Sequence, residues 1–140
     1  MITAPWFWFS IMTLLFFGIT GVTQKLSTNH VSTQLSFLGF AAAFVPLAIA
    51  TAILFPVDLR VSAGVFLLGA VGGVLNSLGA LTSFAAFEAG GKASVVMPII
   101  SLYPLVTVIG AWVFLGEQIS AAHWVGILLA PLAGWLLSSE

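Results

Sequence analysis

The chain has 140 residues, of which 61% are hydrophobic and 5% are charged, with a formal net charge of −1. Soluble globular domains carry about a quarter charged residues, so three basic and four acidic side chains cannot give this sequence a polar surface. Together with a mean hydropathy of +1.21, this composition excludes a soluble protein and indicates an integral membrane protein in contact with the lipid bilayer.

Long apolar runs between short polar segments predict membrane-spanning helices, because a helix needs about 20 apolar residues to cross the hydrocarbon core. The five expected helices cover about 5–23, 33–55, 61–87, 93–115 and 121–137. Their connections are too short to contain a soluble domain. We therefore expect residues 1–140 to form one all-α integral membrane domain, in which neighbouring helices are antiparallel.

The first segment is expected to be a retained span and not a cleaved secretory signal. No basic residue precedes Pro5, and the apolar run through Gly21 is longer than the roughly 7 to 15 residues of a signal h-region. The second segment contains a proline, Pro46, and its exit into water is marked by Pro56.

The third segment carries polar side chains well inside its apolar run. An amide such as that of Asn76 is too costly to expose to lipid tails, so we expect it to face other helices or a cavity. Interhelical hydrogen bonding and substrate contact are both open for Asn76. The hydroxyls of Ser77, Thr82 and Ser83 can instead bond to carbonyls of their own helix.

Glycines also mark the third segment. Gly69 and Gly73 have the G-x-x-x-G spacing that lets helices approach closely in lipid, and Gly72 lies beside them. A helix contact face is the expected role of this pattern. A moving hinge at Gly72 and Gly73 is the alternative.

Two prolines divide the fourth segment, since Pro98 and Pro104 lie six positions apart with Ser101 and Tyr103 between them. Each proline removes a backbone donor and frees a carbonyl on the preceding turn, so the helix should bend here. Freed polar groups at membrane depth need protein, water or ligand as partners. We therefore expect a substrate cavity at the bend, with an ordinary packing kink as the alternative.

The sequence contains few residues that could bind a metal ion or perform thiol chemistry. The chain has no cysteine, and His30 and His123 are far apart in sequence at expected interfaces, so no metal site is predicted. There is also no P-loop, no H-E-x-x-H, no G-x-S-x-G elbow and no basic patch. We expect neither an enzyme nor a nucleic-acid partner, and no cofactor.

Charge gives little preference for one orientation in the membrane. With five spans, Arg60 would lie on one side, and Lys25 and Lys92 on the other. Because Lys and Arg in short loops set orientation, this near balance would allow insertion in both directions. Two oppositely inserted copies would form an inverted pair. A single orientation, set weakly by Lys25 and Lys92, is the alternative.

The second half of the chain contains most of a characteristic series of glycines, prolines and helix-end residues. Its residues are Ala86, the Gly90, Gly91, Lys92, Ala93, Ser94 turn, Pro98, the Tyr103, Pro104, Leu105 step, the helix end from Phe114 through Leu115, Gly116 and Glu117 to Ser120, Gly126 and Gly134. The first half matches more loosely, through an aromatic-rich opening helix with Gly18 and a polar exit at Gln24 and Lys25. In these features the chain resembles one half of a ten-helix, inverted-repeat transporter of the drug/metabolite transporter superfamily, of the EamA-like type.

This resemblance implies a secondary transporter in the cytoplasmic membrane of a bacterium or archaeon. Full-length members of the family carry two five-helix repeats in opposite orientations, so we expect a homodimer, with antiparallel copies. Alternating access would move a small neutral or zwitterionic metabolite or drug through a cavity lined by the third and fourth helices, with aromatic residues from the first. The expected substrate contacts are Asn76, Ser101 and Tyr103, and the expected kink or hinge positions are Pro98, Pro104, Gly72 and Gly73.

Two other classes of function stay open. The same kinks and glycines could serve packing alone, in a structural or assembly subunit of the membrane that transports nothing. A lipid-headgroup flippase is the third possibility. Substrate-dependent flux across a vesicle, and competition by lipids, would separate these classes.

Overall fold

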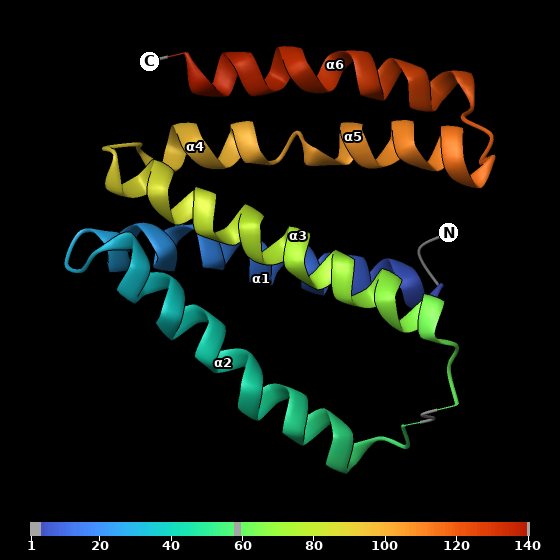
Figure 1. Cartoon of the computed structure of the whole chain (residues 1–140). Coiled ribbons are helices and arrows are strands. Elements are labelled where there is room, and N and C mark those ends of the chain that lie inside the picture. Colours follow the sequence, from blue (N-terminus) through green and yellow to red (C-terminus); the bar gives the residue numbers. More distant parts are fainter. Residues whose placement is uncertain (1–3, 58–59, 140) are drawn as a thin grey trace. The chain divides into compact units, whose positions relative to one another are not determined.

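The computed structural model describes residues 4–57 and 60–139, and this part of the chain contains helices and no strand (Figure 1). Five helical segments are long and apolar enough to cross a membrane. Their bounds are Pro5–Thr28, Thr33–Leu54, Ala63–Glu88, Ala93–Leu115 and Ala121–Ser138. The sequence-based prediction of an all-α membrane fold with five spans is therefore confirmed.

The helices group into two compact units, Met1–Gly90 and Gly91–Glu140, whose relative positions are not determined. The first contains α1 (Pro5–Thr28), α2 (Thr33–Leu54) and α3 (Ala63–Glu88). The second contains α4 (Ala93–Ile100), α5 (Tyr103–Gly110), the π-helix η1 (Ala111–Leu115) and α6 (Ala121–Ser138). A single domain over residues 1–140 stays a prediction.

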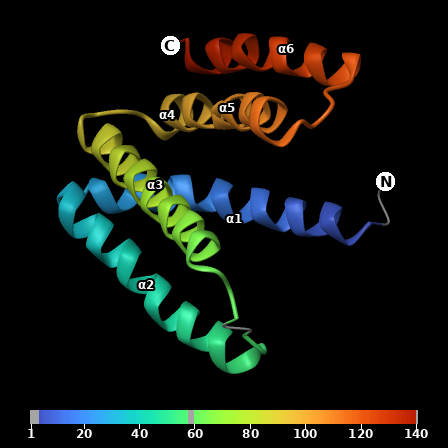
Figure 2. The same cartoon turned by 45° about the vertical axis from the view of Figure 1, so that its right-hand side comes forward.

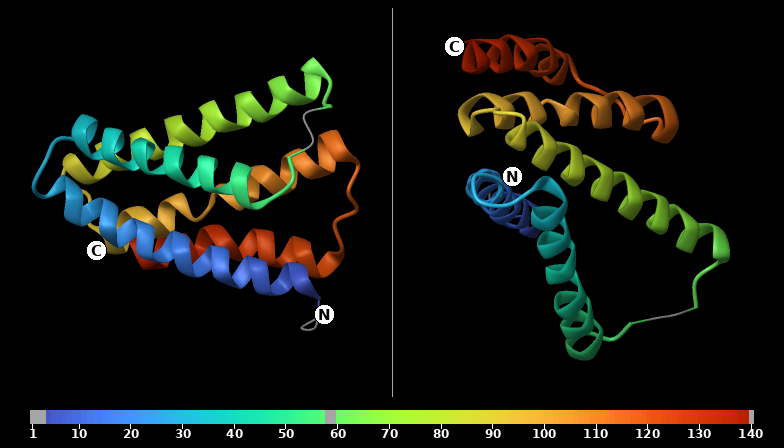
Figure 3. Two further views of the ribbon diagram at one scale, coloured as in Figure 1. Left: turned by 90° about the horizontal axis from the view of Figure 1, so that it is seen from below. Right: turned by 60° about the vertical axis from the view of Figure 1, so that its left-hand side comes forward.

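The three helices of the first unit meet at one end. There the turn between α1 and α2 lies beside the carboxyl end of α3, whereas α2 and α3 separate from each other away from this end (Figures 2 and 3). Phe84 and Phe87, with 2% and 1% of their surface exposed, are the buried hydrophobic residues of the described chain. The core of this unit is therefore small and lies at what we call the closed end.

Side-chain hydroxyls set several helix ends. The side chains of Ser32, Ser62 and Ser120 accept a hydrogen bond from the backbone amide three residues later, at the starts of α2, α3 and α6. Such N-caps satisfy amides that have no partner within the helix. At the other end of α1, the Thr28 hydroxyl donates to the carbonyl oxygens of Gln24 and Lys25, at 3.2 and 3.1 Å. α1 thus ends at Thr28, past the expected end near residue 23.

The fourth span is interrupted between its two prolines. The chain turns at Ser101 and Leu102, between α4, which contains Pro98, and α5, which has Pro104 in its first turn. After α5 the helix widens into η1 and stops at Gly116, whose φ of 68° is left-handed and favours glycine. The Glu117 amide then donates to the carbonyl oxygen of Ala111 at 3.3 Å, which closes the π-helix.

The second unit is an antiparallel pair, in which α6 returns beside α4 and α5 (Figure 1). A glycine lies at a close contact of the pair, because a Cβ atom added at Gly134 would lie 3.1 Å from both Cδ atoms of Leu102. Near the other end, the rings of Trp112 and Trp124 meet edge to face at 6.3 Å. α6 is continuous through Pro131.

Candidate functional site

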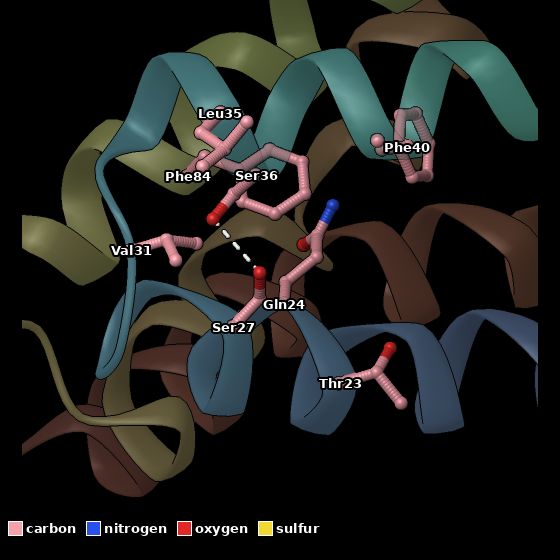
Figure 4. Close-up of a pocket in the computed structure, with 9 residues that line it drawn as sticks. Thr23, Gln24, Ser27, Val31, Leu35, Ser36, Phe40 and Phe84 are labelled. Carbon is pink, nitrogen blue, oxygen red and sulfur yellow. Dashed lines mark hydrogen bonds between the residues drawn. The ribbon is translucent and has the colours of Figure 1, made fainter.

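A pocket of about 270 Å³ opens at the closed end of the first unit, between α1, α2 and α3 (Figure 4). It is lined by Thr23, Gln24, Ser27, Val31, Leu35, Ser36, Gly39, Phe40 and Phe84. We call it the Gln24 pocket. Its wall combines an amide and three hydroxyls with apolar and aromatic side chains, and none of these described residues is charged.

Gln24 reaches from α1 into this pocket and is held there by α3. Its side-chain oxygen accepts a hydrogen bond from the Ser83 hydroxyl at 3.2 Å, and both residues are 8% exposed. The Ser83 hydroxyl also contacts the carbonyl oxygen of Ala80 at 2.7 Å. Figure 4 shows the Gln24 amide nitrogen directed toward the side of the pocket where Phe84 and Phe40 lie. Within residues 4–57 and 60–139, nothing accepts a hydrogen bond from this nitrogen.

A second polar group comes from the turn between α1 and α2. The hydroxyl oxygens of Ser27 and Ser36 lie 2.8 Å apart, so that one of them donates to the other (Figure 4). The Thr23 hydroxyl donates to the carbonyl oxygen of Thr20 at 2.9 Å, which leaves its oxygen able to accept. The pocket therefore offers hydrogen-bonding capacity beyond what the helices themselves use.

Two charged side chains tie the helix ends together at the closed end. The Lys25 ammonium donates to the carbonyl oxygen of Phe87 at 3.0 Å, near the carboxyl end of α3. The Glu88 carboxylate accepts from the backbone amide of Thr33 at 2.9 Å, at the amino end of α2. Each charge has the sign that stabilises the helix end it contacts. These contacts fix all three walls of the Gln24 pocket without placing a charge in its lining.

Asn76 lies on α3 in the first unit, and its side chain is exposed. It forms no hydrogen bond with any residue that the structure describes. Its neighbours behave differently, because the hydroxyls of Ser77 and Thr82 donate to the carbonyl oxygens of Gly73 and Leu78, both at 2.9 Å. These two hydroxyls bond to their own helix, as the sequence suggests. Interhelical contact and substrate contact both remain open for Asn76.

Ser101 and Tyr103 lie on either side of Leu102 in the second unit. The Ser101 hydroxyl donates to the carbonyl oxygen of Met97 at 2.8 Å, which occupies its proton at the break between α4 and α5. Tyr103 is 57% exposed. Asn76 belongs to the first unit, so a cavity shared by all three residues stays a prediction.

The four expected kink or hinge positions lie in two different settings. α3 runs through Gly72 and Gly73 without a break, and a Cβ atom at either would meet no described atom within 4 Å. Within the described part of the first unit, no atom therefore covers the G-x-x-x-G face at these glycines. Pro98 and Pro104 flank the interruption of the fourth span. Movement at any of these positions stays a prediction.

The Gln24 pocket was not predicted from the sequence, where Gln24 reads as a polar exit from the first span. One signal was available, since Gln24 and Ser27 are three residues apart and share a face of α1. The partners of that face, Ser36 on α2 and Ser83 on α3, depend on how the helices pack. A single sequence does not contain that information.

These features define a multi-pass α-helical membrane protein, and the described residues contain no cluster of three acids, histidines or cysteines that could hold a metal ion. The model of the EamA-like transporter family matches residues 4–139, so the chain belongs to this family. Its five spans correspond to one half of a ten-helix transporter of that family. The family is one of transporters and not of enzymes. No curated protein and no solved structure shows significant similarity to the chain.

Proposed function

We propose that this protein carries a small neutral or zwitterionic metabolite or drug across a bacterial or archaeal cytoplasmic membrane. Membership of the EamA-like transporter family supports transport in general. The observation that carries the finer proposal is the amide of Asn76, which is exposed on a membrane-spanning helix and has no hydrogen-bond partner among the described residues. Such a group is costly in lipid, so it faces a water-containing path or another chain.

The substrate class is inferred from the polar residues of the spans. The charged side chains of the sequence lie near the ends of the apolar runs, whereas the polar groups within these runs are amides and hydroxyls. A substrate with a net charge would find no opposite charge along such a path, and an unpaired charge is expensive to desolvate. Asn76, Ser101 and Tyr103 are the proposed substrate contacts.

Alternating access would use the interrupted fourth span. The break at Ser101 and Leu102 supports bending about Pro98 and Pro104, since no continuous helix has to be broken there. We propose Gly72 and Gly73 as a second flexible point. An antiparallel homodimer would supply the second repeat, and it is supported by the near balance of Lys and Arg on the two sides.

The antiparallel arrangement can be tested with single cysteines, because the native sequence contains none. Asn29, in the turn after α1, and Gln118, in the segment before α6, are exposed and are expected on opposite sides of the membrane. In intact cells, an impermeant maleimide should label about half of Asn29→Cys and about half of Gln118→Cys. Permeabilised cells should give complete labelling. Labelling of only one of the two variants from outside would show a single orientation and remove the antiparallel homodimer.

Transport can be tested without knowing the substrate. Proteoliposomes loaded with the small-molecule fraction of a bacterial extract should release at least one neutral or zwitterionic compound faster than protein-free vesicles, as measured by mass spectrometry. Asn76→Leu should slow that release about tenfold, which corresponds to the loss of about one hydrogen bond in the transport step. Ser77→Ala is the matched control, because that hydroxyl bonds to its own helix, and it should leave release unchanged.

Absence of any accelerated release would support a subunit that transports nothing. Movement of a fluorescent lipid between leaflets, without release of soluble compounds, would support a flippase. Either result would overturn the proposal.

A further inference from the structure

Among the residues that the structure describes, the Gln24 amide nitrogen has no hydrogen-bond acceptor, although only 8% of the surface of Gln24 is exposed. The Ser83 hydroxyl shares its single proton between the Ala80 carbonyl oxygen at 2.7 Å and the Gln24 side-chain oxygen at 3.2 Å, and the Gln24 nitrogen lies on the pocket side of the amide (Figure 4). The nitrogen is not among the fully enclosed, unpaired polar atoms of the described residues, so it borders the open pocket. A carbonyl or similar oxygen placed in the pocket could accept a hydrogen bond from it.

The other lining residues indicate which further groups a ligand with that acceptor oxygen should carry. The hydroxyl pair of Ser27 and Ser36 uses one proton in its own contact of 2.8 Å, and its oxygen lone pairs can still accept from a ligand. On the other side, the rings of Phe40 and Phe84 meet edge to face at 5.7 Å and form an aromatic wall. A molecule that joins a carbonyl and an N–H to a flat apolar ring would satisfy both sides.

Charge and size restrict the ligand further. None of the described lining residues is charged, and the nearby charges of Lys25 and Glu88 are used by Phe87 and Thr33. An ionised ligand would therefore be desolvated without a partner. The volume of about 270 Å³ lies at the lower limit of small-molecule pockets, which suits a ligand with one ring.

We propose that the Gln24 pocket is a binding site for a small uncharged carboxamide attached to an aromatic or similar apolar group. The carboxamide oxygen would accept from the Gln24 nitrogen, and its N–H would donate to the hydroxyl pair. The site uses none of Asn76, Ser101 and Tyr103, so it stands even if the proposed transport path is wrong.

Three probes of nearly the same shape test the charge requirement: 4-fluorobenzamide, 4-fluorobenzoate and 4-fluorobenzamidine. Fluorine NMR with the full chain in lipid nanodiscs would measure saturable binding, and protein-free nanodiscs would correct for partition into lipid. The uncharged benzamide should bind at least about tenfold more tightly than the anion or the cation, corresponding to about 1.4 kcal/mol. Equal binding of the three probes, or only non-saturable partition, would overturn the proposal.

Two variants locate the binding. Gln24→Leu should weaken benzamide binding about tenfold, whereas Gln34→Leu, an exposed glutamine of α2 outside the pocket lining, should leave it unchanged. Gly39→Leu is a second variant, because Gly39 lines the pocket and a Cβ atom there meets nothing within 4 Å. It should fill the pocket and abolish binding in a protein that still folds. Unchanged binding in Gly39→Leu would place the probe elsewhere and refute the site.

Discussion

Replacing Phe87 with alanine is expected to lower the free energy of unfolding of the first unit by about 3 kcal/mol. Phe87 is 1% exposed and lies at the closed end, where α1, α2 and α3 meet. Its truncation would remove apolar contacts and leave a cavity where the ring packs. Pulse proteolysis at increasing mole fractions of SDS in mixed micelles would measure the loss.

The matched control is Phe66→Ala on the same helix. Phe66 is 72% exposed, so its ring contacts lipid or a partner and contributes little to the packing of this unit. In lipid, an outward-facing ring finds similar surroundings whether the helices are packed or separated. Its replacement should therefore change the unfolding midpoint little. Equal losses for the two variants would show that the closed end is not the core of the unit.

The five spans could be predicted because they depend on local composition alone. Each helix must bury about 20 apolar residues in lipid, and the polar segments between them are visible in the sequence. The bounds were less predictable where polar residues stay helical. α1 continues to Thr28, and the polar Gln24, which hydropathy places at the exit from the span, is buried against Ser83 of α3.

The candidate sites also differ in whether they depend on local sequence or on how the helices pack. The interruption of the fourth span follows from Pro98 and Pro104, since proline acts through its own backbone chemistry. The Gln24 pocket instead needs Ser83, which is 59 positions away in sequence and reaches Gln24 only when α1 and α3 pack. Hydropathy contains no such information, and a polar residue at the end of a span has the same pattern whether it meets water or a pocket.

Replacing Gly134 with valine is expected to destabilise the pairing of α4 and α6 by about 2 kcal/mol. A Cβ atom at Gly134 would already lie 3.1 Å from both Cδ atoms of Leu102, and the two methyl groups of valine would extend further into the same space. Small residues at such a contact let helices approach closely in lipid. Tryptophan fluorescence during SDS unfolding would follow the loss, since Trp112 and Trp124 are in contact in this unit.

Gly126→Val on the same helix isolates the contribution of packing. A Cβ atom at Gly126 meets no described atom within 4 Å. Gly126→Val therefore gives the same gain in helix propensity as Gly134→Val, but without a close contact to Leu102. Combining Gly134→Val with Leu102→Ala should recover about 1 kcal/mol or more of the loss, because the two side chains then no longer compete for one space. If Gly126→Val were as destabilising as Gly134→Val, or if Leu102→Ala gave no recovery, close approach at Gly134 would not be what holds α6 against α4.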